Sequence, residues 1–396
     1  MKQTFLISQI YLLLFLLMLT TACSSQIAEN NSSQSEPITS ESLPKDNGTN
    51  KTHLRVDLVL QFSVMITAMF EDSKGNFWFG SHGDGLCRYD GKEYTYFTVN
   101  QGLPNGIVRE IAPGPDWSET RKINSGNQIG SIQEDRQGNI WITTGGNMIC
   151  KFDGQYFNPI HTEIERNFPV NQLHTEWEKE LDYLWFAPWS KIGVYHYDGK
   201  KLAHLIFPHP YALVNGISEI YKDKDGAIWF GTMDDGTIRY DGKSFVSIFN
   251  QDEMGICRSV FQDNTGRIWI TNNRFGLYYL EGDTLTNFMK EYALNNNDFN
   301  SDELKTGFQS IEQGKNGDLW FGTFGNGLWR YDDKELTHYT NDNGLPIVTA
   351  KTIYKDKSGQ LWFGLGEGSV YGYNGKSFYR FDGKEQALIE HENKSN

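Results

Sequence analysis

A short tryptophan-centred pattern recurs seven times along the chain, and it limits the possible folds more than any other feature. Three of the copies read NFWFGS, AIWFGT and QLWFGL, and every tryptophan follows Phe, Ile or Leu. Successive copies lie 40 to 63 residues apart, a spacing typical of repeated structural units. Each unit can bury its apolar face only against its neighbours, so the pattern predicts a repeat architecture. The seven residues are Trp78, Trp141, Trp185, Trp229, Trp269, Trp320 and Trp362.

Turn signals on both sides of the tryptophan divide each copy into four short strands. A D-x-x-G turn precedes most of the tryptophans, as at Asp72 and Gly75. Asp can accept bonds from the backbone amides ahead of it, and Gly adopts the left-handed conformation that the turn needs. Y-D-G or a close variant follows the next strand, and Asp-Gly is a strong hairpin signal. In the D-x-x-G turn, the copy at Trp320 has Gly314 in place of the Asp, and the copy at Trp185 lacks both the Asp and the Gly.

Seven units of four antiparallel strands predict an all-β protein, a seven-bladed β-propeller over residues 54–383. Two segments compete for the outer strand of the last blade. Residues 54–72, which begin with LRVDLVL (54–60), align without gaps on residues 245–263, which run from an outer strand into the first strand of the next blade. Residues 376–381 (KSFYRF) follow the last Y-D-G-like turn directly. We expect closure through 54–60, with the other segment as an extra edge strand or cover.

The N-terminal residues predict export and a lipid anchor. Residues 1–22 hold Lys2 and a long apolar run, as signal peptides do, and LTTAC ending at Cys23 resembles the lipobox of bacterial lipoproteins. Lipidated Cys23 would begin a disordered tether over 23–53, which is rich in Ser, Asn and Glu. Residues 384–396 form a C-terminal tail. Ser24 is not the Asp that retains lipoproteins in the inner membrane, so we expect an outer-membrane lipoprotein, periplasmic or surface-exposed.

Charge and cysteine content narrow the partners further. The net charge of -14 argues against nucleic acid, which is bound by Lys and Arg. Cys87, Cys150 and Cys257 show no metal-ligand spacing, and we expect buried thiols rather than a disulfide. No metal or cofactor motif is present, so no cofactor is expected.

Several phrases of the repeats resemble the two-component regulator propeller repeat, among them SKGNFWFGSHGDGLCRYDGK, KDGAIWFGTMDDGTIRYDGK and KNGDLWFGTFGNGLWRYDDK. Large members of that family are envelope sensors whose extracytoplasmic propellers bind a ligand, often a glycan fragment, and signal through a histidine kinase. The resemblance therefore implies a sensory or interaction module. This sequence shows no kinase motif, so signalling would need a separate partner.

The strand order predicts which loops vary. The D-x-x-G and Y-D-G turns fall on one face of the disc, and the loops after the tryptophan strands fall on the other face with the inter-blade connections. GSHGDGL is one of these loops, and it is not a phosphate loop because a strand follows it. We expect this variable face to bind a glycan, a peptide or an envelope protein without catalysis. Candidate contacts are His82, Asp84, Trp117, Trp189, Lys191, Asp234, Arg274, Phe275, Phe324 and Glu367.

A catalytic alternative stays open. Virginiamycin B lyase is also a seven-bladed propeller, and a lyase or hydrolase site would lie in the central funnel. The sequence shows no H-E-x-x-H and no G-x-S-x-G. Convergent His, Glu or Asp side chains in the funnel would favour an enzyme, and an aromatic shelf would favour sugar binding.

Overall fold

The structure is a computed structural model, and its contacts divide the chain into residues 1–55 and 56–396. The residues that it describes all lie in the second unit. The predicted signal peptide, Cys23, the tether and the C-terminal tail lie outside them. The described residues are 60, 62, 64–106, 108–111, 121–161, 164–167, 184–187, 193–207, 216–233, 235–241, 243–249, 255–273, 275–295, 307–345 and 349–381.

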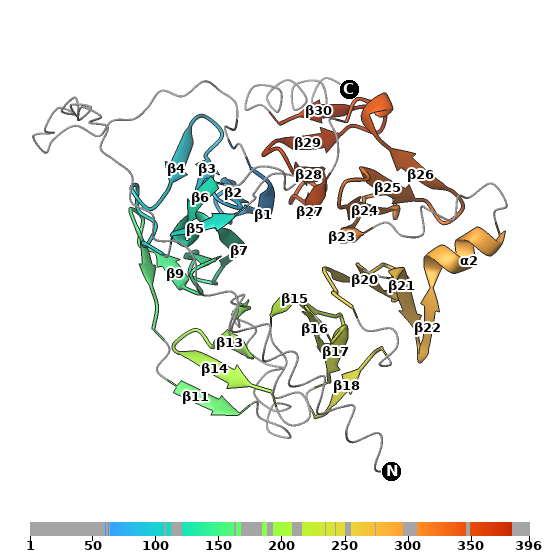
Figure 1. Cartoon of the computed structure of the whole chain (residues 1–396), viewed down its shortest axis with the longest axis horizontal. Coiled ribbons are helices and arrows are strands. Elements are labelled where there is room, and N and C mark those ends of the chain that lie inside the picture. The colour runs from blue at the N-terminus through green and yellow to red at the C-terminus, as the bar shows by residue number, and fades with distance from the viewer. Residues whose placement is uncertain are drawn as a thin grey trace, which may run out of the picture. The chain divides into compact units, whose positions relative to one another are not determined.

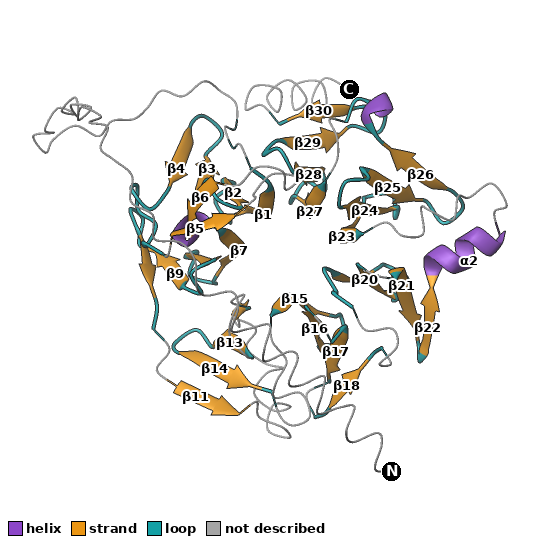
Figure 2. Cartoon of the chain, in the orientation of Figure 1, coloured by secondary structure: helices purple, strands orange, loops and turns teal. Residues whose placement is uncertain are grey.

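Seven four-stranded sheets surround a central axis, which confirms the predicted seven-bladed β-propeller (Figure 1). Strands and short connections make up almost all of the described chain (Figure 2). The first four blades contain β1 (Ile66–Glu71), β2 (Phe77–Ser81), β3 (Leu86–Tyr89), β4 (Tyr94–Phe97); β7 (Ile129–Glu134), β8 (Ile140–Thr144), β9 (Ile149–Phe152), β10 (Phe157–Pro159); β11 (Ile164–Asn167), β12 (Leu184–Phe186), β13 (Val194–Tyr197), β14 (Leu202–Ile206); and β15 (Ile217–Lys222), β16 (Ile228–Thr232), β17 (Thr237–Tyr240), β18 (Phe245–Ser247).

The last three blades follow the same plan. They contain β19 (Val260–Gln262), β20 (Ile268–Asn272), β21 (Gly276–Glu281), β22 (Thr284–Asn287); β23 (Phe308–Gln313), β24 (Leu319–Thr323), β25 (Leu328–Tyr331), β26 (Leu336–Tyr339); and β27 (Ala350–Lys355), β28 (Leu361–Leu365), β29 (Val370–Tyr373), β30 (Phe378–Arg380). The remaining elements are the hairpin of β5 (Val108–Ile111) and β6 (Arg121–Asn124), helix α2 (Phe288–Asn295), and the 3-10 turns η1 (Ser125–Asn127) and η5 (Asn341–Asn343).

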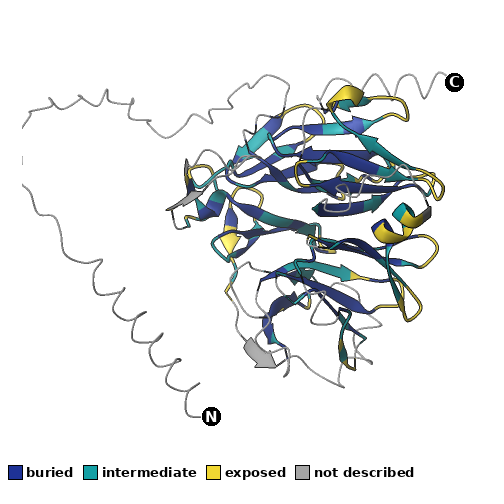
Figure 3. Ribbon diagram, turned by 45° about the vertical axis from the view of Figure 1, so that its right-hand side comes forward, coloured by how far each residue is buried: buried dark blue, intermediate teal, exposed yellow. Residues whose placement is uncertain are grey.

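The first strand of a blade lies nearest the axis and the fourth lies at the rim. Figure 1 shows β1, β7, β15, β23 and β27 around the centre, with β4, β18, β26 and β30 outside. The tryptophan strands β2, β8, β16, β20, β24 and β28 are buried along their whole length. Figure 3 shows buried strands in dark blue through the interior of the molecule. Bands of buried side chains join neighbouring blades. One such cluster unites Trp78 of the first blade with Ile129 and Ile142 of the second.

The third blade differs from the plan. Its rim strand is β11, which pairs in parallel with β14, whereas the strands of the other blades pair only antiparallel. The strand order predicts that residues 158–174 form one of the inter-blade connections of the variable face. That prediction is wrong for part of the segment, because residues 157–159 form β10 and residues 164–167 extend the next blade at its rim.

Ring closure also differs from the expectation. The fourth strand of the last blade is β30, within KSFYRF, whereas we expected residues 54–60 in this place. Of the residues expected to close the ring, the structure describes Leu60. Leu60 is buried against the last blade in one cluster with Trp362 and Phe381. KSFYRF forms this strand because only a tight turn separates it from β29, so that the pairing costs little loop entropy.

The seam between the last and first blades is chemically like an internal junction. At the seam the backbone N–H of Glu71 donates to Tyr354 Oη at 2.8 Å, and Lys357 Nζ donates to the Asp72 carbonyl. Between the fourth and fifth blades Tyr221 Oη accepts from the N–H of Gln262 at 3.0 Å, and Lys224 Nζ donates to the Asp263 carbonyl at 2.8 Å. Equivalent residues therefore make the bonds at both places.

The Asp of the D-x-x-G turn anchors the tryptophan. Asp72 accepts from the N–H groups of Lys74 and Asn76 as predicted, and its Oδ2 also accepts from Trp78 Nε1 at 2.9 Å. The third turn residue after it, Gly75, has φ 83°, in the left-handed region. The same indole bond has a length of 2.8 Å in four other blades, for the pairs Trp141–Asp135, Trp229–Asp223, Trp269–Asp263 and Trp362–Asp356.

The sixth blade keeps this bond with a different residue. Gly314 stands where the other turns have Asp, and Trp320 Nε1 donates instead to Asp318 Oδ2 at 2.8 Å. Asp318 also accepts from Arg330 Nε at 2.6 Å. A Cβ at Gly314 would lie 2.4 Å from Asp318 Oδ1, so the two acidic positions exclude each other in this conformation.

The three described cysteines are buried and free, as predicted. Cys87 lies in β3 and Cys150 in β9, at matching places in adjacent blades. Burial raises the pKa of the Cys150 thiol to about 12 and that of the Cys257 thiol to about 12. These thiols therefore remain protonated at neutral pH and serve as small core side chains.

Candidate functional site

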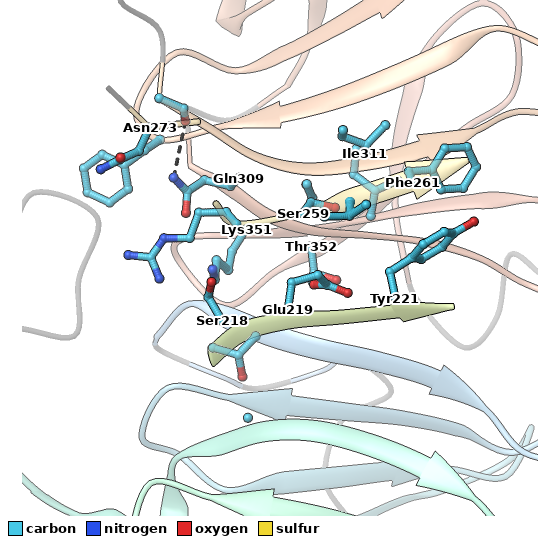
Figure 4. Close-up of a pocket in the computed structure, with 18 of the residues that line it drawn as sticks. Ser218, Glu219, Tyr221, Ser259, Phe261, Asn273, Gln309, Ile311, Lys351 and Thr352 are labelled. Carbon is cyan, nitrogen blue, oxygen red and sulfur yellow. Dashed lines mark hydrogen bonds between the residues drawn. The ribbon is translucent and has the colours of Figure 1, made fainter. Parts of the chain in front are cut away.

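A cavity of about 920 Å³ lies at the centre of the ring. Its walls are the first strands β1, β7, β15, β19, β23 and β27, and its mouth is formed by loops that follow the tryptophan strands. Figure 4 shows side chains from these strands around one space. The volume falls within the range of small-molecule sites in proteins.

A β-bulge in the first strand turns one side chain per blade into this cavity. In five blades the pairing with the tryptophan strand skips one residue of the first strand. The skipped residue lines the cavity in every case. Bulges re-aim a side chain in this way without breaking the rest of the ladder. The five residues are Thr67, Gly130, Ser218, Gln309 and Lys351.

Arg258 holds the same position in the fifth blade. It lies three residues before Phe261, which pairs with Trp269, just as Lys351 lies three residues before the partner of Trp362. The Thr271 hydroxyl accepts from the N–H of Arg258 at 3.0 Å and from the N–H of Ser259 at 2.8 Å. This hydroxyl replaces the ladder bonds that the irregular backbone gives up, and Arg258 joins the ring of cavity-lining residues.

Gly130 has no side chain, and the other five residues at these positions divide into two groups. The Thr67 hydroxyl donates to the Ile129 carbonyl at 2.5 Å, and the Ser218 hydroxyl donates to the Cys257 carbonyl, so these short side chains tie one blade to the next. Arg258, Gln309 and Lys351 have long side chains and come from three consecutive blades. The donor-rich side chains therefore gather on one side of the cavity, where Figure 4 shows Gln309 and Lys351.

The two cationic side chains of the cavity, Arg258 and Lys351, form no ion pair with a described carboxylate. Among the residues that the structure describes, no carboxylate lies within 4.0 Å of the Arg258 or Lys351 nitrogens. Arg258 Nε is buried without a hydrogen-bond partner in this described part, and an Nη lies 3.4 Å from Met233 Sδ. Burial and the charge of Arg258 lower the pKa of Lys351 to about 8, although Glu219 opposes the shift. Two cations thus share one small space.

Glu219 and His82 are the other titratable groups near these cations. Burial raises the pKa of Glu219 to about 8, against the opposing effect of Lys351. Burial and the charge of Lys351 lower the pKa of His82 to about 4, so its imidazole is neutral at pH 7. A second acid that lines the cavity, Glu312, forms an ion pair with Lys355 at 3.1 Å.

The residues predicted from sequence fall into three sets. His82 and Phe324 line the cavity, and Phe324 is 41% exposed. Asp84, Phe275 and Glu367 lie in loops after tryptophan strands but do not line it; Glu367 instead accepts from Ser369 Oγ at 2.5 Å. Outside the described residues are Trp117, Trp189, Lys191, Asp234 and Arg274.

Sequence reasoning missed Glu219, Arg258, Gln309 and Lys351. It searched the loops and took the first strand of each blade as scaffold. A signal was present, because aligned first strands carry polar residues at one position that core packing alone does not require. The bulge, which brings that position to the cavity, has no marker residue.

Two kinds of feature are absent from the described residues. They contain no group of three His, Cys, Asp or Glu side chains arranged to hold a metal ion. No helix among them has the length and apolar character to cross a bilayer.

Comparison with known proteins agrees with this architecture. Residues 61–83, 125–146 and 213–234 match the family model described as two component regulator propeller. Each match covers a first strand, its D-x-x-G turn and the following tryptophan strand. The chain is a seven-bladed β-propeller in which three segments match the two-component regulator propeller repeat. No curated protein matches the sequence significantly.

Solved structures share the fold at low identity. The extracellular domain of the hybrid two component system BT4673 from B. thetaiotaomicron is 20% identical with a TM-score of 0.55, over 82% of this chain and 39% of that domain. This chain thus spans about two fifths of that domain. YCF48 bound to D1 peptide is 11% identical with a TM-score of 0.51, over 80% of this chain and 95% of that one.

Virginiamycin B lyase from Staphylococcus aureus is a more distant match. It is 14% identical with a TM-score of 0.40, over 82% of this chain and 86% of the lyase. A score this low carries no argument about activity.

Proposed function

We propose that this chain is a non-catalytic, ligand-binding module of a bacterial cell envelope, and that the central cavity is its binding site. The ring of bulges carries the proposal. The same backbone irregularity occurs in blade after blade, and it presents a different side chain to the cavity each time. A repeated backbone with varied, convergent side chains suits recognition.

The loops at the mouth fit the same role. One residue after the tryptophan strand of each of four blades lines the cavity at its mouth. These residues are His82, Met233, Asn273 and Phe324. Phe324 offers an exposed aromatic face, on which a sugar ring or an apolar peptide side chain can pack. The sensor domain and the peptide-bound propeller that share this fold support a ligand-binding role. A separate envelope protein would carry the signal onward.

The test is to fill the cavity and repeat a binding screen. Ser259 lines the cavity and is labelled in Figure 4, and its hydroxyl makes no hydrogen bond within the described part of the chain. Ser259→Trp would place an indole in the site. The purified domain would be screened on glycan and peptide arrays. We expect Ser259→Trp to lose the ligands that the unmodified protein binds.

Ser377→Trp is the matched control, because Ser377 lies exposed in the last hairpin turn, away from the cavity. The control should keep every ligand, and circular dichroism should show that both variants are folded. Binding that survives Ser259→Trp unchanged would place the site elsewhere on the molecule.

We also propose that a lipid on Cys23 anchors the propeller to the outer membrane. Cys23 lies outside the described residues, so the support is the lipobox-like LTTAC alone. Three acyl chains on one Cys would hold the protein stably. Cys23→Ser should move the protein from membrane to soluble fractions on immunoblots. Retention of this variant in the membrane fraction would contradict the anchor.

A lyase or hydrolase is the second candidate function. His82 and Glu219 line one cavity, and a neutral imidazole can accept a proton. Mass spectrometry of each bound ligand after incubation decides between the two. Conversion that is lost in His82→Ala would establish an enzyme, whereas recovery of intact ligand supports a binding module.

A further inference from the structure

The cavity contains two cations, Arg258 and Lys351, that form no ion pair with a described carboxylate, in a protein whose net charge is -14. Arg258 and Lys351 are half-buried, and no described carboxylate lies within ion-pair distance of either nitrogen group. Like charges in one small cavity repel each other, and burial adds a desolvation cost. An arrangement that costs folding free energy suggests a ligand that compensates for it.

The two cations lie at the same level of the ring. Lys351 and Gln309 occupy the bulge positions of β27 and β23, and Arg258 holds the matching position just before β19. Arg258, Gln309 and Lys351 therefore form an arc of N–H donors at one depth. The Gln309 amide makes only a long bond, 3.4 Å, to the Gly307 carbonyl, drawn as a dashed line in Figure 4. A guanidinium, an amide and an ammonium suit a carboxylate with several lone pairs.

The charges that face this arc favour an anion. Glu219 on β15 interacts electrostatically with Lys351 and raises the pKa of its ammonium, against the larger lowering by burial. Glu312 on β23 is already paired with Lys355. His82, after β2, is neutral at pH 7. Even with Glu219 ionised, Arg258 and Lys351 leave one positive charge in excess.

The rest of the lining fits a hydroxyl-rich molecule. Hydroxyl and amide side chains stand beside the arc, and an exposed phenyl ring stands at the mouth. Hydroxyls and amides can both donate to and accept from sugar hydroxyls. They are Ser218, Ser259, Ser310, Thr352 and Asn273, with Phe324 at the mouth.

We infer that the cavity binds an acidic sugar, whose carboxylate pairs with Arg258 and Lys351 and whose hydroxyl groups meet the surrounding hydroxyl and amide side chains. The inference rests on the proposed ligand-binding function and names the ligand class of the same site.

The first experiment compares acids with their neutral esters by isothermal titration calorimetry. The probes are D-glucuronate, D-galacturonate and N-acetylneuraminate, each beside its methyl ester, which keeps the ring and loses the charge. We expect at least one acid to bind at least 10-fold more tightly than its ester. If no acid binds more tightly than its ester, the inference is wrong.

A peptide arm separates the two sources of a carboxylate. Acetylated peptides of one sequence with a free or an amidated C-terminus are titrated in the same way. We expect no binding that depends on the free peptide carboxylate. Peptide acids that bind while sugar acids do not would overturn the assignment to a sugar.

The variants are chosen so that their expected effects on affinity for the acid differ, because a misfolded variant would lose affinity for both the acid and its ester. Arg258→Gln and Lys351→Gln should each weaken binding of the acid at least 10-fold and leave its ester unchanged. Glu219→Gln removes the one unpaired acid that could oppose the ligand carboxylate, so this variant should bind the acid at least as tightly as the unmodified protein does. Lys376→Gln, on the exposed last turn, is the charge-matched control and should bind as the unmodified protein does.

The two proposals fail in different ways. Equal weakening of acid and ester by Arg258→Gln would overturn the carboxylate assignment. Looser binding in Glu219→Gln would overturn it as well. In either case, ligands that Ser259→Trp abolishes would still support the cavity as the binding site.

Discussion

Two positions of each blade lie close together and behave in opposite ways. In the second strand, Trp recurs in all seven copies, and its indole N–H bonds an Asp in six blades of the described structure. In the first strand, the bulge position recurs as a backbone shape but carries Thr, Gly, Ser, Arg, Gln and Lys. The chain repeats side chains where blades pack and repeats only the backbone where the cavity is lined.

The difference separates stability from recognition within one blade. A buried indole with a satisfied N–H contributes the same packing everywhere, so any change there costs stability. The bulge presents its side chain to a cavity, where replacement changes chemistry more than packing. Four predictions follow from this contrast, from the largest expected effect to the smallest.

Removing an indole should have the largest effect. Trp229 is 1% exposed in the core between the fourth and fifth blades. Trp229→Ala should lower the free energy of unfolding by about 3–5 kcal/mol, because it leaves a large cavity. Urea unfolding followed by circular dichroism measures the loss. A loss below about 1 kcal/mol would remove the proposed distinction between the two positions.

The sixth blade allows a sharper test of the Asp–Trp bond. Gly314→Asp should cost about 1–3 kcal/mol, because the new side chain meets Asp318. Asp318→Asn should also destabilise, because it removes the ion pair with Arg330. Together the two changes recreate the first blade, where Asn76 Nδ2 donates to Asp72 Oδ2 at 2.7 Å. We expect the double variant to recover stability beyond additivity by about 1 kcal/mol.

Urea midpoints of the two single variants and the double variant complete that cycle. Additive losses would show that the two acidic positions do not replace each other. In that case the hydrogen bond from Trp320 Nε1 to Asp318 would not take the place of the Asp–Trp bond of the other blades.

Acid should weaken the turns of the first two blades. Burial raises the pKa of Asp72, but the bonds from Asn76 and Trp78 outweigh it and leave the pKa below its usual 3.8. Asp135 is shifted in the same direction. The folded chain therefore binds fewer protons than the unfolded chain, and this part of the stability is present above about pH 4 and is lost as pH falls through the folded pKa.

The double variant Asp72→Asn and Asp135→Asn keeps an acceptor and removes the charge. Its unfolding free energy should change less between pH 5 and pH 3 than that of the unmodified protein, by about 1 kcal/mol. Urea titrations at several pH values measure this slope. An unchanged slope would place the acid sensitivity in other groups.

Changing a bulge residue should have the smallest effect on stability. Lys351→Gln removes one of two neighbouring cations, and no hydrogen bond of its ammonium is present in the described structure. The free energy of unfolding should stay within about 0.5 kcal/mol or rise. A loss comparable to that of Trp229→Ala would show that the bulge ring is structural, and would end the contrast.

Much of the fold could be predicted because turns and packing residues repeat. Asp72 and its counterparts mark a hairpin, and the tryptophans mark a buried strand. The third blade and the seam could not be predicted in the same way. Leu60 is as apolar as a rim strand requires, and only the three-dimensional ring shows that it packs on the last blade while β30 supplies the strand.

The candidate site could be predicted only in part. His82 and Phe324 lie in loops that sequence reasoning singles out, and they reach the cavity. Lys351 and Glu219 lie in strands, where an alternating pattern gives each residue one of two faces. A bulge shifts that alternation by one residue without any Gly or Pro to mark it. The register, which the sequence does not show, decides which of them faces the centre.

The seam between the last and first blades has a consequence for how the chain can be cut and joined. A Tyr hydroxyl and a Lys ammonium bridge the seam with the same partners as at the junction of the fourth and fifth blades. The ring therefore has no privileged starting blade in these contacts. A circular permutant that opens between the fourth and fifth blades, with the old ends linked, would exchange a covalent junction for an equivalent noncovalent one.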